Sequence, residues 1–144
     1  MPVEAIFDFM NLKAIKKFYW TTFGLSLVIL PLNIGLGIVV IGLVILPVLI
    51  LHFIIGLNLS KIEHHISLII LSGINLLIFA LIRPDGVHTF TDNGLSSALD
   101  IFGINAGYNR EYENYFFVGS LILLIAQLIM EIRLIKLVKV NKAP

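Results

Sequence analysis

Four polar side chains interrupt long apolar stretches of the sequence, and their types could support chemistry. They are His52, Asn75, Gln127 and Glu131. A polar group in an apolar stretch is costly, so each marks a candidate site for a proton, ion or substrate. A histidine beside a carboxylate could bind and release a proton, because histidine changes charge between pH 5 and 8. His52 and Glu131 would form such a pair if they lie at the same depth.

A simpler interpretation of the same residues competes with this one, and we favour it. Glu131 is close in sequence to Arg133 and Lys136, either of which could neutralise it. His52 would then donate a hydrogen bond to a backbone carbonyl. The polar residues would in that case stabilise the fold and carry no chemistry.

A second polar group, Glu63, His64 and His65, lies at a turn beside Lys61. Histidine ligates both metals and haem, so His52 with His64 or His65 could in principle hold either. A pair of haem ligands in a helical bundle must face each other deep in the core, which a charged turn does not favour. The chain has no cysteine, which excludes thiolate ligands and nucleophiles. We therefore expect no metal and no cofactor.

Catalytic motifs are missing from the sequence. It has no Gly-x-Ser-x-Gly, no His-Glu-x-x-His, no Walker loop and no dinucleotide fingerprint. Ser96 and Ser97 are near His88 and Asp92 in sequence, but a serine triad requires one defined geometry, which proximity in a loop does not supply. The sequence therefore favours a protein that is not an enzyme.

The composition indicates which environment positions these residues. Of 144 residues, 58% are hydrophobic and 13% are charged, and the mean hydropathy is +1.00. Soluble domains carry about 25% charged residues, and a soluble fold of this size could not bury so much apolar surface. The net charge of +1 gives no attraction to nucleic acid. We expect an all-α integral membrane protein in contact with the lipid bilayer.

The uncharged stretches set the number of spans. Residues 18–59 contain no charged side chain, yet as one helix they would be about 63 Å long, twice the hydrocarbon thickness. The stretch must fold back, and the proline and glycines of 31–37 favour the turn there. We predict four transmembrane helices at residues 18–32, 37–57, 65–82 and 115–135. Because 18–32 is short, the first is expected to begin within 13–17.

The distribution of basic residues tests this count. Four spans place eight basic residues on one side: Lys13, Lys16, Lys17, Lys61, Arg133, Lys136, Lys139 and Lys142. Only Arg83 and Arg110 lie on the other. Because cytoplasmic flanks collect Lys and Arg, both termini are predicted to be cytoplasmic, in a multi-pass protein of the cell membrane, of the bacterial inner-membrane type.

The remaining segments are predicted to flank the bundle. Residues 2–17 resemble an amphipathic interfacial helix, and 136–144 a basic tail that interacts with lipid headgroups. Residues 83–114 form the outer loop, with a short helix at 93–102. Thr91, Asp92 or Asn93 would cap this helix and Gly103 would end it, with Leu95, Ala98, Leu99 and Phe102 on its apolar face.

The end of the outer loop mixes aromatic and charged residues, which suits contact with a partner. The candidates are Tyr108, Asn109, Arg110, Glu111, Tyr112 and Glu113. Aromatic residues also concentrate at membrane interfaces, and we favour that explanation, in which the segment orients the fourth span.

The pentapeptide Leu-Val-Ile-Leu-Pro occurs twice, at 27–31 and 43–47. In a chain built from so few residue types we attribute this to chance. The alternative is a pair of interrupted helices of the kind that transporters use.

The function ranked first is a non-catalytic membrane subunit, assembly factor or partner-binding protein, alone or as a homo-oligomer. The alternatives are a small oligomeric transporter or channel using His52, Asn75, Gln127 and Glu131, and a histidine-based haem or metal protein.

Overall fold

The computed structural model describes residues 12–32, 37–84, 93–104 and 113–141, and within them the chain is helical apart from short connections. A single antiparallel bridge there joins Pro84 to Asn93. The α-helices are α2 (Leu12–Ile29), α3 (Gly37–Leu57), α4 (Ile66–Ile82), α5 (Gly94–Ile101) and α6 (Glu113–Val140). Short 3-10 turns are at Leu30–Leu32, Leu59–Lys61 and Glu63–His65.

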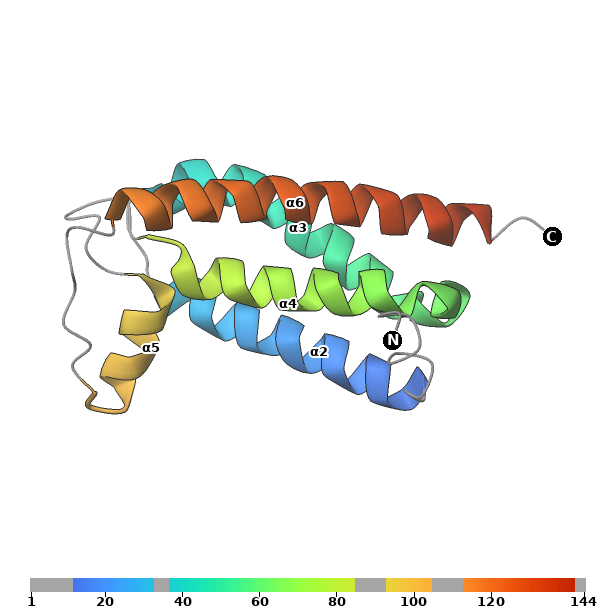
Figure 1. Cartoon of the computed structure of the whole chain (residues 1–144), viewed down its shortest axis with the longest axis horizontal. Helices are drawn as coiled ribbons and strands as arrows, with labels where there is room; N and C mark the ends of the chain where they lie inside the picture. Colours follow the sequence, from blue (N-terminus) through green and yellow to red (C-terminus); the bar gives the residue numbers. More distant parts are fainter. Residues whose placement is uncertain (1–11, 33–36, 85–92, 105–112, 142–144) are drawn as a thin grey trace, which may run out of the picture.

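The four long helices lie side by side and alternate in direction, with α5 across one end (Figure 1). Polar contacts tie them at both ends. At one end Lys16 Nζ lies 3.4 Å from Ser60 Oγ, and Asn141 Nδ2 donates to the Lys61 carbonyl. At the other end, Arg83 Nη2 donates to the Leu30 carbonyl at 2.8 Å. The starts of α2 and α4 and the ends of α3 and α6 therefore share one end.

Two glycines allow helices to pack closely. A Cβ on Gly73 would lie 2.8 Å from Thr22 Oγ1, across the contact between α4 and α2. A Cβ on Gly56 would lie 2.8 Å from the Trp20 ring, across the contact between α3 and α2. Close backbone approach at small residues is the usual basis of helix association in lipid.

The interior is divided into two apolar clusters. The first, near the α3–α4 turn, contains Ile15, Tyr19, Ile55, Leu59, Ile62, Ile69, Leu134 and Val138. The second, toward α5, contains Phe23, Leu30, Ile45, Leu76, Phe79 and Ala80. On α3 and α4, the polar residues described below lie between the two clusters in sequence.

Two helices extend further than the sequence analysis assigned. Residues 12–17, assigned to an interfacial helix, are the first turns of α2. Residues 136–140, assigned to a separate tail, continue α6, which has 28 residues and a length of about 42 Å. Neither segment contains a proline or glycine to end the helix. Residues 2–11 and 142–144 of the predicted flanks lie outside the described residues.

The short helix predicted at 93–102 is present as α5, Gly94–Ile101. Asn93 caps it: Asn93 Oδ1 accepts from the Ser96 N–H at 2.9 Å, and the Asn93 N–H donates to Ser96 Oγ at 3.0 Å. Gly103, with φ of +71°, follows its end. A Cβ on Gly94 would clash with the Ala80 carbonyl, so α5 lies close against α4 at its start. Leu95 and Phe102 of the predicted apolar face are exposed.

Arg83 follows α4 at the start of the predicted outer loop, and it is buried there, with 3% of its surface exposed. The bond to Leu30 explains this burial, because it holds the guanidinium against the end of α2.

One helical segment among the described residues, Glu63–Ile82, is long and apolar enough to cross a membrane by length and composition. Gly42–Leu57 forms a shorter apolar helix.

Candidate functional site: a buried polar network

Five polar side chains from three helices meet inside the molecule. They are His52 of α3, Ser72 and Asn75 of α4, and Gln127 and Glu131 of α6. All but Asn75 are completely buried, and Asn75 is 7% exposed. Burying polar groups is costly unless they are hydrogen-bonded, so their partners decide what the cluster does.

One carboxylate oxygen is the centre of this network. Glu131 Oε1 lies 2.6 Å from His52 Nδ1 and accepts a hydrogen bond from Ser72 Oγ at 3.1 Å. It accepts a third hydrogen bond from Gln127 Nε2, one helical turn earlier on α6. Side chains from α3, α4 and α6 thus converge on one oxygen atom. Gln127 Nε2 also lies 3.4 Å from His52 Nδ1.

Asn75 and Gln127 fix the direction of these hydrogen bonds. Asn75 Nδ2 donates to Gln127 Oε1 at 2.8 Å and to the Leu123 carbonyl at 2.9 Å. The Gln127 amide therefore turns its Nε2 toward Ser72 Oγ, at 3.0 Å, and toward Glu131. The hydrogen bonds therefore run in one direction, from Asn75 through Gln127 and Ser72 to the carboxylate of Glu131.

Helix α2 covers the imidazole with an aromatic ring. The rings of Tyr19 and His52 stack with centroids 4.1 Å apart and planes 7° from parallel. The Tyr19 hydroxyl donates to the His52 carbonyl at 2.9 Å, and Phe23 lies on the same imidazole at 5.1 Å. All four long helices therefore contribute to the site.

Two atoms of the pair have no hydrogen-bond partner in the described part of the chain: His52 Nε2 and Glu131 Oε2. Buried side-chain polar atoms usually have a hydrogen-bond partner, and these two atoms are where the network departs from that rule.

Glu131 has a partner other than the one favoured from sequence. Its Oε1 contacts His52, whereas Arg133 and Lys136 are exposed and Glu131 is completely buried. The reason is helical geometry: residues two and five positions further along α6 point away from the face that carries Glu131.

The structure brings together the four polar candidates His52, Asn75, Gln127 and Glu131. The sequence analysis missed Ser72 and Tyr19. Ser72 has a recognisable signal, since it precedes Asn75 by three residues and so shares its helix face. Tyr19 has none, because a tyrosine near the start of an apolar stretch is typical of an interfacial anchor.

The other candidates lie elsewhere. Glu63, His64 and His65 are exposed in the 3-10 turn, and the structure does not bring them to His52. In the segments that the structure describes, no three possible metal-ligating side chains come together. Ser96 is engaged in the cap of α5, while Asp92 and His88 lie outside the described residues. The partner candidates Tyr108 to Tyr112 also lie outside them, and Glu113 begins α6.

Comparison with known proteins gives no relative: no protein-family model, curated protein or solved structure matches the chain.

Proposed function

We propose that this chain is a four-span membrane protein with both ends in the cytoplasm that acts as a non-catalytic subunit or partner-binding protein. The proposal rests on where polar and apolar side chains lie, because their distribution is the reverse of that in a water-soluble protein. The polar network is sealed inside, while large apolar side chains face outward. Extended apolar surfaces of this kind mark contact with lipid or with other proteins.

The exposed apolar side chains occur on several helices. Leu43 of α3 is 77% exposed, Val28 of α2 is 62% exposed, and Ile129 of α6 is 61% exposed. In water these faces would favour aggregation, whereas in hydrocarbon they carry no such cost. The fold is therefore suited to a bilayer.

The charges at the two ends of the fold support the orientation. Lys16 and Lys61 are held at the end where α2 begins and α6 finishes, and Lys139 is in the last turn of α6. The opposite end carries Arg83 and α5. An excess of basic residues at one end is typical of the cytoplasmic side.

The internal bonding of the network supports a non-catalytic role. The hydrogen bonds of the network join its members to one another or to the backbone. They link His52, Ser72, Gln127 and Asn75 to one another, to Glu131 or to a backbone carbonyl. Polar bonds between helices stabilise helix association in membranes. The outer surface and the outer loop are then the parts available to a partner.

Single cysteines test the four-span arrangement, because the natural chain has none. Asn33→Cys is expected to react with a membrane-impermeant maleimide added outside intact cells. Ser60→Cys is expected to react only after the cells are opened. If Asn33→Cys is reachable only from the cytosol, the four-span arrangement is wrong.

Co-purification tests the partner-binding role. Deleting residues 105–112 is expected to remove a membrane partner that the intact chain retains in mild detergent, while the protein still inserts. If every co-purifying protein stays bound, the outer loop does not bind the partner.

A second candidate function is a proton-coupled carrier. It is favoured by His52 Nε2 and Glu131 Oε2, which find no hydrogen-bond partner among the residues that the structure describes. In vesicles with a pH-sensitive dye inside, His52→Ala and Glu131→Gln are each expected to abolish proton-linked flux. Unchanged flux in both variants would eliminate the carrier.

A further inference from the structure

The outward face of α6 changes from apolar to basic near the end of the helix. Three isoleucines on this face are 60%, 61% and 41% exposed, namely Ile125, Ile129 and Ile132. Three exposed basic side chains follow them, namely Arg133, Lys136 and Lys139. Leu134 and Val138, on the other face of the same turns, are buried in the core. One side of α6 therefore suits hydrocarbon as far as Ile132 and anionic groups beyond it.

The position of this change matches the thickness of a bilayer. The one charged side chain of α6 between Glu113 and Arg133 is Glu131, which is completely buried. The helix rises about 30 Å from Glu113 to Arg133, and the hydrocarbon core of a bilayer is about 30 Å thick. With α6 across the bilayer, Arg133 lies at the level of the headgroups, and Lys136 lies about 4.5 Å beyond it.

The start of α2 shows the same change on another side of the fold. Lys13 and Lys17 are exposed there, whereas Leu25 and Val28, further along the helix, are 47% and 62% exposed. Helix α4 lies between α2 and α6 and contacts both (Figure 1). Because the exposed face of each helix points away from the bundle, the basic side chains of α2 and α6 lie on different sides of the fold.

The connection between α3 and α4 adds to this basic end. Lys61 is exposed in it and donates from Nζ to Asn58 Oδ1 at 2.9 Å. Lys16 Nζ of α2 lies 3.4 Å from Ser60 Oγ of the same connection. The basic side chains at this end form what we call the basic collar, namely Lys13, Lys16, Lys17, Lys61, Arg133, Lys136 and Lys139. Among the residues described there, Glu63 is the one exposed carboxylate.

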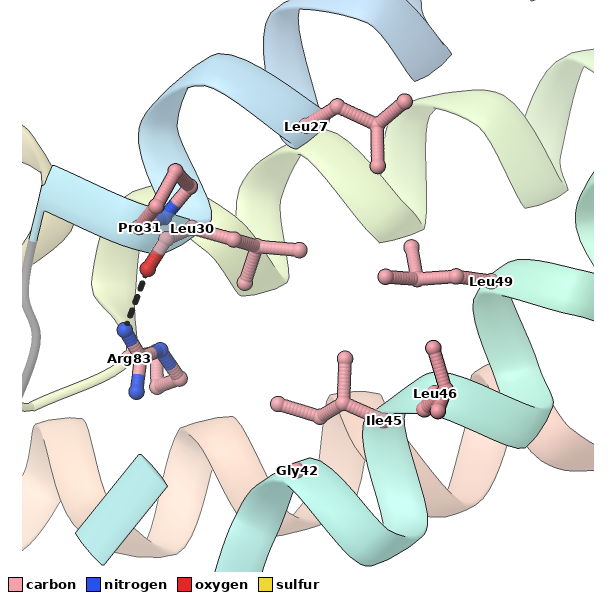
Figure 2. Close-up of a pocket in the computed structure, with 8 residues that line it drawn as sticks. All are labelled: Leu27, Leu30, Pro31, Gly42, Ile45, Leu46, Leu49 and Arg83. Carbon is pink, nitrogen blue, oxygen red and sulfur yellow. Dashed lines mark hydrogen bonds between the residues drawn. The ribbon is translucent and has the colours of Figure 1, made fainter. Parts of the chain in front are cut away.

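The described residues at the opposite end of the fold form no comparable basic surface. Arg83 is the one basic side chain among them, and it is buried. It lines the end of an apolar groove between α2 and α3, beside Gly42, and donates to the Leu30 carbonyl (Figure 2). Within the described part of the chain, exposed positive charge therefore lies at one end of the bundle.

The shape of the basic collar favours a lipid leaflet over a docked protein. A protein segment would cover one side of the fold, whereas the collar faces outward from α2, from α6 and from the α3–α4 connection. A leaflet surrounds the fold on all sides. On α2 and α6 the basic side chains also border an exposed apolar face, as headgroups border hydrocarbon. Lys and Arg at that boundary are attracted to an anionic leaflet.

We propose that the basic collar binds the headgroups of anionic phospholipids in the cytoplasmic leaflet. The proposal rests on the four-span arrangement above, and it extends the lipid contact predicted for residues 136–144 to Arg133 and to the start of α2. Lys13 and Lys17 bind headgroups on the α2 side of the fold. Arg133 and Lys136 bind them on the α6 side, where the guanidinium can pair with a phosphate through two hydrogen bonds.

Trp20 is the only tryptophan of the chain and lies one helical turn from Lys17, so its fluorescence reports on lipid at the α2 side. The full chain is reconstituted in phosphatidylcholine vesicles that contain phosphatidylglycerol or phosphatidylcholine brominated close to the headgroup. At low salt, the brominated phosphatidylglycerol is expected to quench Trp20 with about fivefold higher apparent affinity. Lys13→Gln with Lys17→Gln is expected to remove this preference. Salt at about 1 M is expected to remove it too, because the charges are then screened within about 3 Å.

A second reporter supplies the matched control. Trp20→Phe with Ile132→Trp moves the tryptophan to the outward face of α6, beside Arg133. In that background, Arg133→Gln with Lys136→Gln is expected to remove the preference for phosphatidylglycerol, whereas Lys13→Gln with Lys17→Gln is expected to keep it. At Trp20 the two pairs of substitutions are expected to exchange their effects. The four basic side chains are exposed, so their replacement leaves the packing of the core in place.

Equal quenching by both lipids at low salt, in protein that resists alkaline extraction, overturns the proposal and leaves an acidic protein as the match for the collar. A preference that survives neutralisation of the basic pair on the reporter's own helix overturns it as well. Labelling of Ser60→Cys from outside intact cells would overturn the leaflet that the proposal names. Release of the protein by alkaline extraction would instead overturn the membrane placement on which the proposal rests.

Discussion

The Tyr19 ring lies flat on the His52 imidazole, 4.1 Å away, while its hydroxyl donates to the carbonyl of the same residue. Tyr19 of α2 thus contacts both the ring and the backbone of His52 on α3. The stacking restricts the imidazole to the plane in which Nδ1 reaches Glu131. Tyr19 is therefore a positioning residue for the network.

Separating the two contacts of Tyr19 gives the first prediction. Tyr19→Phe keeps the stacking and loses the hydroxyl bond, which is expected to lower the free energy of unfolding by about 1 kcal/mol. Tyr19→Leu loses both contacts and is expected to cost about 1 kcal/mol more, because aromatic pairs contribute beyond their buried area. Unfolding by denaturing detergent, followed by circular dichroism, measures both. Equal losses in the two variants would show that the ring contact contributes nothing.

The buried pair gives the second prediction. His52→Leu leaves the Glu131 charge buried without its imidazole partner and is expected to cost about 3–5 kcal/mol. Adding Glu131→Gln removes the charge, so the double variant is expected to be more stable than His52→Leu alone. The same unfolding assay measures the four members of the cycle. Additive losses would mean that the two side chains do not interact.

Gly73 and Gly42 form a matched pair for the third prediction. Gly73→Ala brings a Cβ within 2.8 Å of Thr22 Oγ1, which is held by bonds to the carbonyls of Phe18 and Tyr19. We expect a loss of about 1–3 kcal/mol, because α2 and α4 must separate.

Gly42→Ala meets nothing and gains helix propensity, so it is expected to raise stability by up to about 1 kcal/mol. Thermal unfolding in one detergent compares the two variants. The packing explanation fails if both substitutions shift the midpoint in the same direction.

The cap of α5 gives a local prediction. Asn93→Ala removes the acceptor of the Ser96 N–H and is expected to destabilise α5 by about 1 kcal/mol, leaving the long helices unchanged. Hydrogen exchange should therefore speed up about fivefold at α5 amides and stay constant in α4. Asn93→Asp, which keeps the acceptor, serves as the control and is expected to protect α5 as the natural residue does.

The elements that the sequence predicts best are those controlled by local chemistry. The break at Pro31 and Gly37 and the limits of the short helix at Asn93 and Gly103 depend on single residues. Proline lacks the N–H that continues a helix, and glycine permits a positive φ. Pro47 lies inside α3, so a proline alone does not end a helix, and the break needs the glycines that follow Pro31. Signals of this kind can be read from a few neighbouring residues.

The sequence offers His52 as one possible partner of Glu131 but gives no local signal that selects it over the nearby basic residues. Arg133 is near it in sequence, whereas His52 is 79 positions away and reaches it only through the rotation of α3 against α6. Helix α3 is apolar on all sides, so its sequence does not indicate which face turns inward. The groove beside Gly42 depends on the spacing of two helices and is equally hidden from the sequence.

Helix α6 carries Glu131 and Lys139 on one uninterrupted rod, with their Cα atoms about 12 Å apart along the axis. An uninterrupted α-helix turns as a unit, so a rotation applied at Lys139 would reach the carboxylate. A protein that binds the last turn of α6 and rotates it would move Glu131 away from His52. The buried pair could then be controlled from the end of α6, with no ligand entering the core.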